Sequence, residues 1–258
     1  MKLRLDHALT QRGLTPTRSQ AESWVRLGRV RVAGKVITKP GFFVDDAAKI
    51  DLSAPEQYVS RAGLKLASVV DVFGVDFQGK IVLDVGSSTG GFTDYALQHG
   101  AARVYAIDVG TDQLHPSLRG EARIELHEKT DIRNIRLESE AGGQQEIGAP
   151  QVVYIAAPDI IVCDVSFVSL RNILPHLSRL MTPRTVCLVM VKPQFEASRS
   201  QLTKGGIVKN DRVRRDIFHD FELWTKRNFL IRAKADSDIA GAHGNRERFY
   251  DLGLIAAL

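Results

Sequence analysis

The spacing of hydrophobic residues divides the chain into a short first part and a longer second part. From Lys80 onward, short apolar runs alternate with stretches of helical periodicity, a pattern typical of a parallel sheet with helices on both faces. The pattern predicts strands at residues 81–85, 104–109, 124–126, 160–163 and 186–191, followed by an antiparallel pair at 230–235 and 249–254. We therefore expect an α/β domain with a seven-stranded, mostly parallel sheet.

The first part shows a different pattern. Apolar residues recur near helical spacing from Leu3 to Leu9 and from Ala21 to Leu27, and Gly13 and Pro16 separate the two runs. Alternating valines around the Ala-Gly-Lys sequence at 33–35 then predict a β-hairpin. We expect a small α+β unit over residues 1–53, a linker over 54–59 and the larger domain over 60–258. The segment 138–151, rich in Glu, Gly and Gln, is expected to be a loose surface connection.

Composition adds limits on the class of protein. The 258 residues are 44% hydrophobic and 25% charged, as in ordinary soluble proteins. The sequence shows neither the apolar segment of a signal peptide nor a run of about 18 apolar residues, so we expect a cytoplasmic protein without a membrane partner. Cys163 and Cys187 lie in apolar runs, which favours buried thiols over a disulfide or a metal site.

The distribution of charge is more informative than its total. The formal net charge is +5, and the first 40 residues contain nine Lys or Arg against two acidic residues. The positive charge is therefore concentrated in the first unit, which suggests a polyanionic partner. A solvated basic face without a partner would have the same composition.

A glycine-rich turn follows the first predicted strand of the larger domain. Residues 86–91 read Gly-Ser-Ser-Thr-Gly-Gly and lead into a helix, so backbone N–H groups can approach a bound nucleotide. Asp108 follows the next strand and is placed to accept hydrogen bonds from a ribose diol. NAD is the competing ligand, and its site requires Gly-x-Gly-x-x-Gly, whereas Ser88 replaces the middle glycine, which the usual turn for S-adenosylmethionine also has. NAD is disfavoured because Asp84, two residues before Gly86, is the usual acidic opening of a turn that binds S-adenosylmethionine, a cofactor without the pyrophosphate that requires extra glycine.

The turn therefore favours S-adenosylmethionine as the cofactor. The candidate cofactor-binding residues are Asp84, Gly86, Ser88, Thr89, Gly90, Gly91, Asp108 and Asp131. Two interpretations of Asp131 stay open, because its carboxylate can accept a hydrogen bond from an adenine amino group or cap a helix N-terminus.

Four charged residues in separate motifs supply the candidate chemistry. Lys65 lies in SRAGLKL (60–66), Asp164 in VCDVSF (162–167), Lys192 in VKPQFE (191–196) and Glu247 in GNRERF (244–249). Asp164 and Lys192 end predicted parallel strands, the edge where open α/β sheets bind ligands. Each residue alone is explained as well by an ordinary surface charge, a strand-end cap or a hairpin charge; the joint pattern favours a shared site.

The order Lys-Asp-Lys-Glu is similar to the tetrad with which S-adenosylmethionine enzymes methylate a ribose 2′-hydroxyl. A hydroxyl that attacks a methyl group must lose its proton, and a lysine must be neutral to accept it. We assign Lys192 as the base, and Lys65 and Glu247 as residues that orient the ribose. Asp164 is expected to hold Lys192 or to face the cationic end of the cofactor.

Nearly the whole chain resembles the TlyA family, which joins a small S4-like RNA-binding domain to an FtsJ-like catalytic domain of the Rossmann-like class I methyltransferase fold. The likeness rests on the four motifs above, on the turn 86–94 and on Lys204-Gly205-Gly206, and in the first unit on residues 4–6, 17–21 and 28–36. The resemblance implies 2′-O-methylation of cytidine in ribosomal RNA, with ribosomal RNA or ribosomal subunits as partners. The candidate RNA-binding residues are Arg4, Arg18, Arg26, Arg29 and Lys35.

Two other functions remain open at this point. The chain could be a catalytically inactive RNA-binding or ribosome-assembly factor, or a haemolysin-like membrane-active protein, since the family has also received that label. A basic stretch before a predicted helix either extends the RNA-binding surface or forms a solvated face; it contains Lys204, Lys209, Arg212, Arg214 and Arg215.

Overall fold

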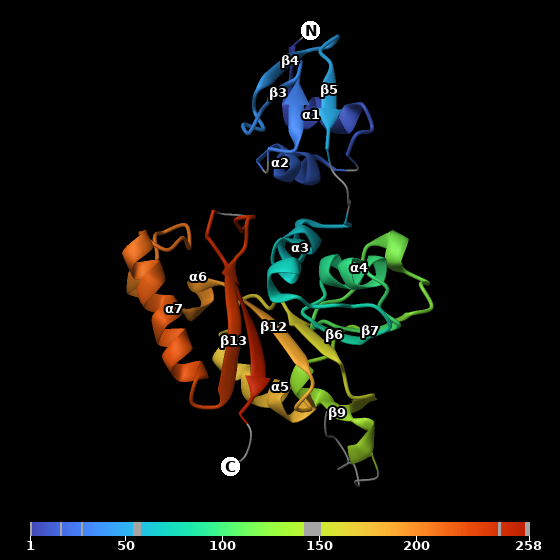
Figure 1. The fold of residues 1–258 in the computed structure, drawn as a ribbon, viewed down its shortest axis with the longest axis vertical. Helices are drawn as coiled ribbons and strands as arrows, with labels where there is room; N and C mark the ends of the chain where they lie inside the picture. Colours follow the sequence, from blue (N-terminus) through green and yellow to red (C-terminus); the bar gives the residue numbers. More distant parts are fainter. Residues whose placement is uncertain are drawn as a thin grey trace.

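The computed structural model describes residues 2–15, 17–26, 28–53, 58–141, 151–241 and 244–255. They form a small N-terminal unit and a larger α/β domain, which meet near helix α3 (Arg61–Phe73) of the larger domain (Figure 1). The predicted linker falls mostly outside these residues, since 54–57 are not among them. In the described part of the chain, no helix is long and apolar enough to cross a membrane.

A seven-stranded sheet forms the centre of the larger domain. Its strand order is β13-β14-β12-β11-β6-β7-β8, and β14 runs antiparallel to both of its neighbours while the other neighbouring strands are parallel. The strands are β6 (Ile81–Val85), β7 (Arg103–Ile107), β8 (Ile124–His127), β11 (Ile160–Cys163), β12 (Val186–Val191), β13 (Phe229–Asp236) and β14 (Arg248–Leu254). The predicted sheet is confirmed. The second strand was predicted too long, since it ends at Ile107, and Asp108 and Val109 border the cleft described below. The other predicted bounds of these strands differ from the structure by at most one residue.

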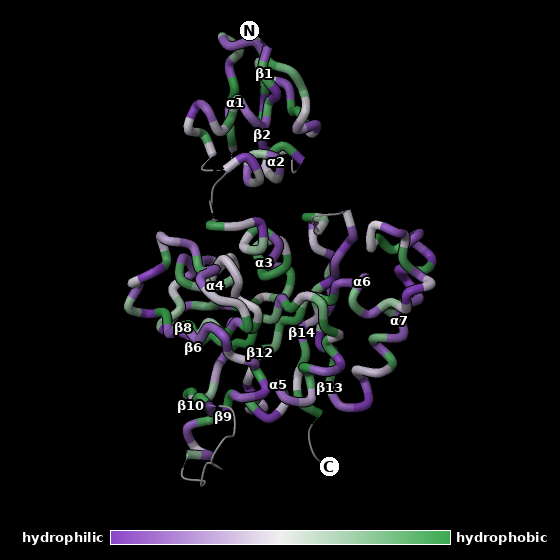
Figure 2. The backbone as a smooth tube through the Cα atoms, turned by 180° about the vertical axis from the view of Figure 1, so that it is seen from behind, coloured by the Kyte–Doolittle hydropathy of each residue, from purple (hydrophilic) through white to green (hydrophobic). Residues whose placement is uncertain are grey.

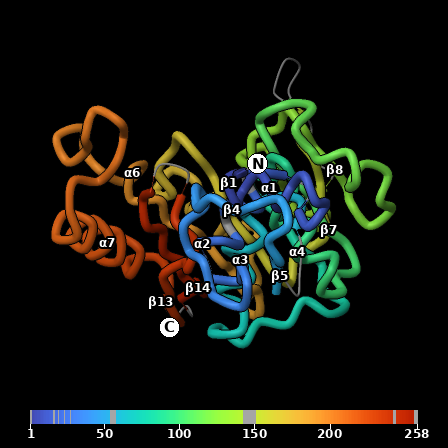
Figure 3. Tube along the Cα trace, turned by 90° about the horizontal axis from the view of Figure 1, so that it is seen from above, coloured from blue at the N-terminus to red at the C-terminus, as the bar shows by residue number. Residues whose placement is uncertain are grey.

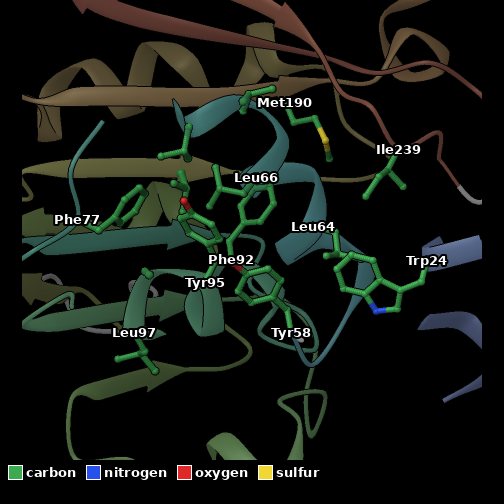
Figure 4. Packing of buried hydrophobic residues seen from close by; sticks show 14 of the residues in the cluster. Trp24, Tyr58, Leu64, Leu66, Phe77, Phe92, Tyr95, Leu97, Met190 and Ile239 are labelled. Carbon is green, nitrogen blue, oxygen red and sulfur yellow. The ribbon is translucent and has the colours of Figure 1, made fainter. Parts of the chain in front are cut away.

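Alternate residues of the central strands pack against two different layers of helices. Val82 and Val162 belong to a core with α3 and α4 (Gly91–Gln98), whereas Leu83 and Cys163 belong to a core with α5 (Leu174–Leu180) and α7 (Asp211–Thr225). Figure 4 shows part of the first core, with Leu66 of α3 beside Phe92 of α4. In Figure 2, hydrophobic segments run through the middle of the domain around β12 and β14. These two cores hold the strand ends that carry the site.

The N-terminal unit contains α1 (Leu5–Gln11), α2 (Arg18–Arg26) and short strands. The predicted hairpin is confirmed: β2 (Val30–Val32) pairs antiparallel with β3 (Lys35–Val36) across a turn in which Ala33 and Gly34 both have positive φ, the conformation that matches strand twist in a two-residue hairpin turn. The first helix was predicted too long. Residues Lys2–Arg4 form strand β1, because they pair with β4 (Phe43–Asp45), and β5 (Ile50–Leu52) adds a further strand beside β2.

The two units meet where α2 lies over α3, as the view from above shows (Figure 3). Trp24 of α2 lies beside Leu64 of α3 (Figure 4), and the Gln20 side chain donates a hydrogen bond to the Tyr58 carbonyl. The Tyr58 ring then packs 5.4 Å from the Tyr95 ring of α4. The segment that leads into α3 thus packs against α4, the helix that follows the glycine-rich turn.

Shorter elements complete the larger domain. Strands β9 (Ile135–Leu137) and β10 (Val153–Ile155) form a separate parallel pair. The expected loose connection 138–151 joins them, and residues 142–150 of it lie outside the described residues. The remaining helical turns are η1 (Pro116–Leu118), η2 (Ile132–Asn134), η3 (Glu138–Glu140), η4 (Leu170–Asn172), α6 (Pro193–Glu196) and η5 (Arg199–Gln201). Cys163 and Cys187 are buried free thiols.

Candidate active site

The glycine-rich turn joins β6 to α4 at the carboxyl edge of the sheet. Gly86 and Gly90 have φ values of 81° and 87°, a region that favours glycine. A Cβ on Gly86 would also lie 2.9 Å from the carbonyl oxygen of Asp164. Glycine is therefore required where the turn passes β11.

Ser88 adopts a left-handed conformation at the position where a dinucleotide site has glycine, with a φ of 45°. Its N–H donates to Asp108 Oδ2 over 2.7 Å, and its hydroxyl donates to Gln113 Oε1 over 3.0 Å. Asp108 also accepts from the N–H of Gly110 over 2.6 Å. These bonds fasten the turn to the loop after β7, so a serine is held in a conformation that usually costs about 1 kcal/mol or more.

Gly91 lies where α4 approaches α3. A Cβ there would lie 2.2 Å from Ser60 Oγ and 2.8 Å from the Cβ of Ala62. Gly91 therefore permits the close contact of the two helices. It also borders the smaller of the two cavities described next.

Two cavities open at this edge of the sheet. The larger has a volume of about 770 Å³ and is bordered by Gly86, Ser88, Asp108, Val109, Asp131, Ile132, Asp164, Phe167 and Ile173, among others. The smaller, of about 140 Å³, is bordered by Asp84, Ser87, Thr89, Gly91 and Lys192, and it shares Gly86, Ser88, Asp164 and Ser166 with the first. A nucleotide-sized cleft thus leads to a narrow slot at Asp164 and Lys192.

Asp131 performs the capping role, because its carboxylate accepts from the Arg133 N–H over 2.9 Å at the start of η2. The Arg133 guanidinium also donates to it, and this bond lowers the pKa of Asp131. The residue borders the large cleft as well, so the cap and a cofactor contact are compatible.

Asp84 is a buried carboxyl group at the small cavity. Burial raises its pKa to about 7, an effect that the nearby Asp164 and Asp108 carboxylates strengthen and a hydrogen bond from Thr93 Oγ1 of 2.6 Å opposes. Among the described residues, neither Asp84 Oδ1 nor the buried Ser87 Oγ has a hydrogen-bond partner. Buried polar atoms are rarely left unpaired, so the small cavity is suited to a polar ligand group.

The register of the strands brings the four motif residues together. Val191 pairs with Arg248 between β12 and β14, so Lys192 and Glu247 lie at the same end of these strands. Asp164 follows β11, the parallel neighbour of β12, and Lys65 reaches the same edge from α3. The four residues form two ion pairs, Lys65 Nζ to Glu247 Oε2 and Lys192 Nζ to Asp164 Oδ1, each 2.5 Å long.

Glu247 shows that the two pairs influence each other. Its side chain is 3% exposed. Burial raises its pKa, although Lys65 and Lys192 act in the opposite direction, and Asp164 acts in the same direction as burial. The site therefore combines two cations and two carboxylates in a mostly buried setting, where charges interact more strongly than in water.

The sequence interpretation missed several residues at this site. Lys192 Nζ donates to Ser166 Oγ over 2.8 Å, the Phe195 ring lies 5.3 Å from that of Phe167, and the Glu196 carboxylate accepts from Leu170 N–H over 2.7 Å. All of them lie in or next to the motifs around Asp164 and Lys192, but no local pattern indicates which side chains touch.

The candidate RNA-binding residues fall into two groups. Arg4 and Arg18 both donate to Asp6, which is 0% exposed, and keep about half of their side chains in solvent. Arg26, Arg29 and Lys35 are exposed. In the basic stretch near α7, Lys209 donates to the Ser200 carbonyl and Arg214 pairs with Asp211, whereas Lys204, Arg212 and Arg215 are exposed.

Residues 58–253 match the family model of FtsJ-like methyltransferases, and residues 3–50 match that of the S4 domain. The chain belongs to the FtsJ-like methyltransferase family. Hemolysin A of Brachyspira hyodysenteriae is 36% identical over 95% of this chain and 97% of its own length. The 16S/23S rRNA (cytidine-2′-O)-methyltransferase TlyA of Mycobacterium tuberculosis is 35% identical over 83% of this chain and 75% of its own.

Among solved structures, a candidate hemolysin from Streptococcus thermophilus is 35% identical, covers 99% of this chain and 90% of its own, and superposes with a TM-score of 0.69. The chain is thus similar over most of its length both to proteins labelled as methyltransferases and to proteins labelled as hemolysins.

Proposed function

We propose that this FtsJ-like protein transfers a methyl group from S-adenosylmethionine to the ribose 2′-hydroxyl of a cytidine in ribosomal RNA. The observation that carries the proposal is that the Asp164–Lys192 pair borders the slot where the nucleotide-sized cleft ends, and that the Lys65–Glu247 pair lies close enough for the charges of the two pairs to interact. The relatives named as rRNA (cytidine-2′-O)-methyltransferases support the substrate class.

The residues at the cleft fit S-adenosylmethionine. Asp108 offers carboxylate oxygens at the strand end where a ribose diol is usually bound, and Val109, Ile132 and Ile173 offer apolar surface for an adenine. Asp84 Oδ1, which has no hydrogen-bond partner among the residues that the structure describes, suits a cationic amino group. When bound, the cofactor supplies an activated methyl group on a positively charged sulfur.

The tetrad supplies alignment and proton transfer. Lys192 accepts the proton of the 2′-hydroxyl at Nζ, for which it must first be neutral. The ammonium that results is stabilised by the adjacent Asp164 carboxylate and by the Ser166 hydroxyl. Lys65, held by Glu247, donates to the ribose and fixes its orientation, and such alignment can account for a large share of the rate.

The N-terminal unit, residues 1–53, holds the RNA in this proposal, and the domain from residue 60 onward performs the chemistry. Phosphate contacts from Arg26, Arg29 and Lys35 would position the RNA without reading its sequence. The half-exposed Arg4 and Arg18 lie on the same unit and are fixed in direction by Asp6. Exposed Lys204, Arg212 and Arg215 are candidates to extend this surface.

A labelling experiment tests the proposal. The protein and its Lys192→Ala variant are incubated with isotope-labelled S-adenosylmethionine and either unmodified ribosomes or separated subunits, and the digested nucleosides are analysed by mass spectrometry. We expect labelled 2′-O-methylcytidine with the wild-type protein and a loss of at least about 100-fold with the variant.

The alternatives give other outcomes. An inactive RNA-binding or assembly factor would bind ribosomal particles and leave no label in any of them. A haemolysin-like protein would release dye from lipid vesicles, and that release would be independent of Lys192. Equal label from the wild type and Lys192→Ala would contradict the assignment of Lys192 as the base.

A further inference from the structure

The segments that follow β11 and β12 contact each other at three successive places. Lys192 contacts Asp164 and Ser166, the Phe195 ring packs 5.3 Å from the Phe167 ring, and Glu196 reaches the residues just before and at the start of η4. The first contact belongs to the tetrad. The other two have no part in the chemistry proposed above.

The third contact is made by a buried carboxylate whose two oxygens each accept a hydrogen bond. The Glu196 side chain is 2% exposed, Oε2 accepts from Ser169 Oγ over 2.7 Å, and Oε1 accepts from the Leu170 N–H over 2.7 Å. The Arg171 guanidinium lies 3.6 Å from Oε2. Hydrogen bonds to a charged acceptor are about twice as strong as neutral ones, so Glu196 is a firm anchor for this loop.

The loop needs such an anchor because it contains a strained residue. Phe167 has a φ of 65° and is 92% exposed, so neither a favourable backbone conformation nor burial holds it in place. A left-handed conformation costs roughly 1–3 kcal/mol at a residue other than glycine and persists only when neighbouring contacts fix it. Ser166, bound to Lys192, fixes one side of Phe167, and Glu196 fixes the other.

We propose that Glu196 is a positioning residue for the Asp164–Lys192 pair. It acts through the loop 164–170, which it joins to the short helix α6 that begins directly after Lys192. Without this carboxylate, Phe167 would relax to a negative φ, and Asp164 and Ser166 would move relative to Lys192 Nζ. A displacement of about 1 Å at reacting groups can cost about 100-fold in rate.

Two variants and a matched control test the inference, which rests on the proposed methylation only for its kinetic part. Glu196→Ala removes both acceptors, and Glu196→Gln keeps one. Glu222→Gln is the control, because Glu222 is also a largely buried carboxylate, bound by Lys234 and Tyr250 and 3.8 Å from Arg248, and none of these partners is a tetrad residue. Hydrogen exchange of residues 165–170 is measured in the free protein, and kcat and KM are measured with ribosomal subunits.

In Glu196→Ala we expect the loop amides to exchange at least about 10-fold faster and kcat to fall about 100-fold, with both KM values within about twofold. Glu196→Gln should fall between this variant and the wild type. Glu222→Gln should lower the melting temperature and leave kcat and the exchange of 165–170 unchanged.

Unchanged exchange in Glu196→Ala would overturn the inference, and so would faster exchange with an unaltered kcat. If kcat fell by the same factor in Glu196→Ala and in Glu222→Gln, Glu196 would have only a general stabilising role. If the wild-type protein methylates no particle, the proposed function fails, and the exchange measurement alone still decides whether Glu196 fixes the loop.

Discussion

Asp6 in the N-terminal unit and Glu247 in the catalytic domain are both buried carboxylates paired with cations, yet their surroundings differ. Asp6 accepts from Arg4, Arg18 and the His7 N–H. Burial alone would raise its pKa, but the hydrogen bonds and charges of Arg4 and Arg18 lower it to about 2. The pKa of Glu247 is raised because burial outweighs the effect of Lys65. The donors around Asp6 thus favour its charged form, whereas the charged form of Glu247 depends on the nearby lysines and is opposed by burial.

The largest effect should come from Glu247→Gln. The amide oxygen can still accept from Lys65, but the charge that holds the ammonium is lost, so we expect kcat for methylation to fall about 100-fold or more. Stability should change less than in Asp6→Asn. A kcat within twofold of the wild type would show that Glu247 has a structural role like that of Asp6.

Asp84→Asn tests a third buried carboxyl group by its pH dependence. The pKa of Asp84 in the folded protein is raised from 3.8 to about 7, so its contribution to stability is complete below about pH 4 and is lost as the pH rises towards 7, by about 1 kcal/mol for each pH unit. The variant should remove this slope and be more stable than the wild type at pH 8. Urea unfolding at pH 5 and pH 8 measures it, and parallel slopes in the two proteins would contradict it.

Asp6→Asn should mainly lower stability. Because the pKa of Asp6 is lowered to about 2, its contribution is present above about pH 4 and is lost as the pH falls towards 2, and we expect it to be about 2 kcal/mol. Denaturant unfolding at pH 7 and pH 3 measures it, and the difference between variant and wild type should shrink at pH 3. Methylation kcat of the folded variant should be unchanged, in contrast to Glu247→Gln.

The smallest effect is expected for Ser88→Gly. Glycine relieves the left-handed strain at this position, which should offset the lost hydroxyl contact and raise stability by up to about 1 kcal/mol. Ser87→Gly is the control, because Ser87 does not have a positive φ, and it should be destabilising. Thermal melts and calorimetric titration with S-adenosylmethionine would check both, and a loss of stability in Ser88→Gly would disprove the account of strain.

The sequence predicted those parts of the fold that depend on local pattern. The apolar runs Ile81–Val85 and Val186–Val191 are buried strands with the predicted bounds. Lys2–Arg4 was assigned to a helix because its true partner, Phe43–Asp45, lies far along the chain, and helical spacing was the only local signal. Strand β4 was missed for the same reason.

The candidate site, too, could be predicted only in part from local sequence. Lys65, Asp164, Lys192 and Glu247 could be selected because each stands in a distinctive motif, and the structure places them together. The ion pair of Arg18 with Asp6, and the contacts of Glu196 with Ser169 and Leu170, form only when separate segments meet. The roles of Lys192, Glu247 and Glu196 in catalysis are predictions that the experiments above test.

The position of β14 has a consequence for the synthesis of the protein. Although β14 is the last strand that the structure describes, it lies inside the sheet, between β12 and β13, and Glu247 immediately precedes it. A nascent chain can therefore hold three of the four tetrad residues while the fourth is still untranslated. If the proposed function holds, a growing chain remains unable to modify RNA until this strand inserts, so activity would begin in one late step of folding.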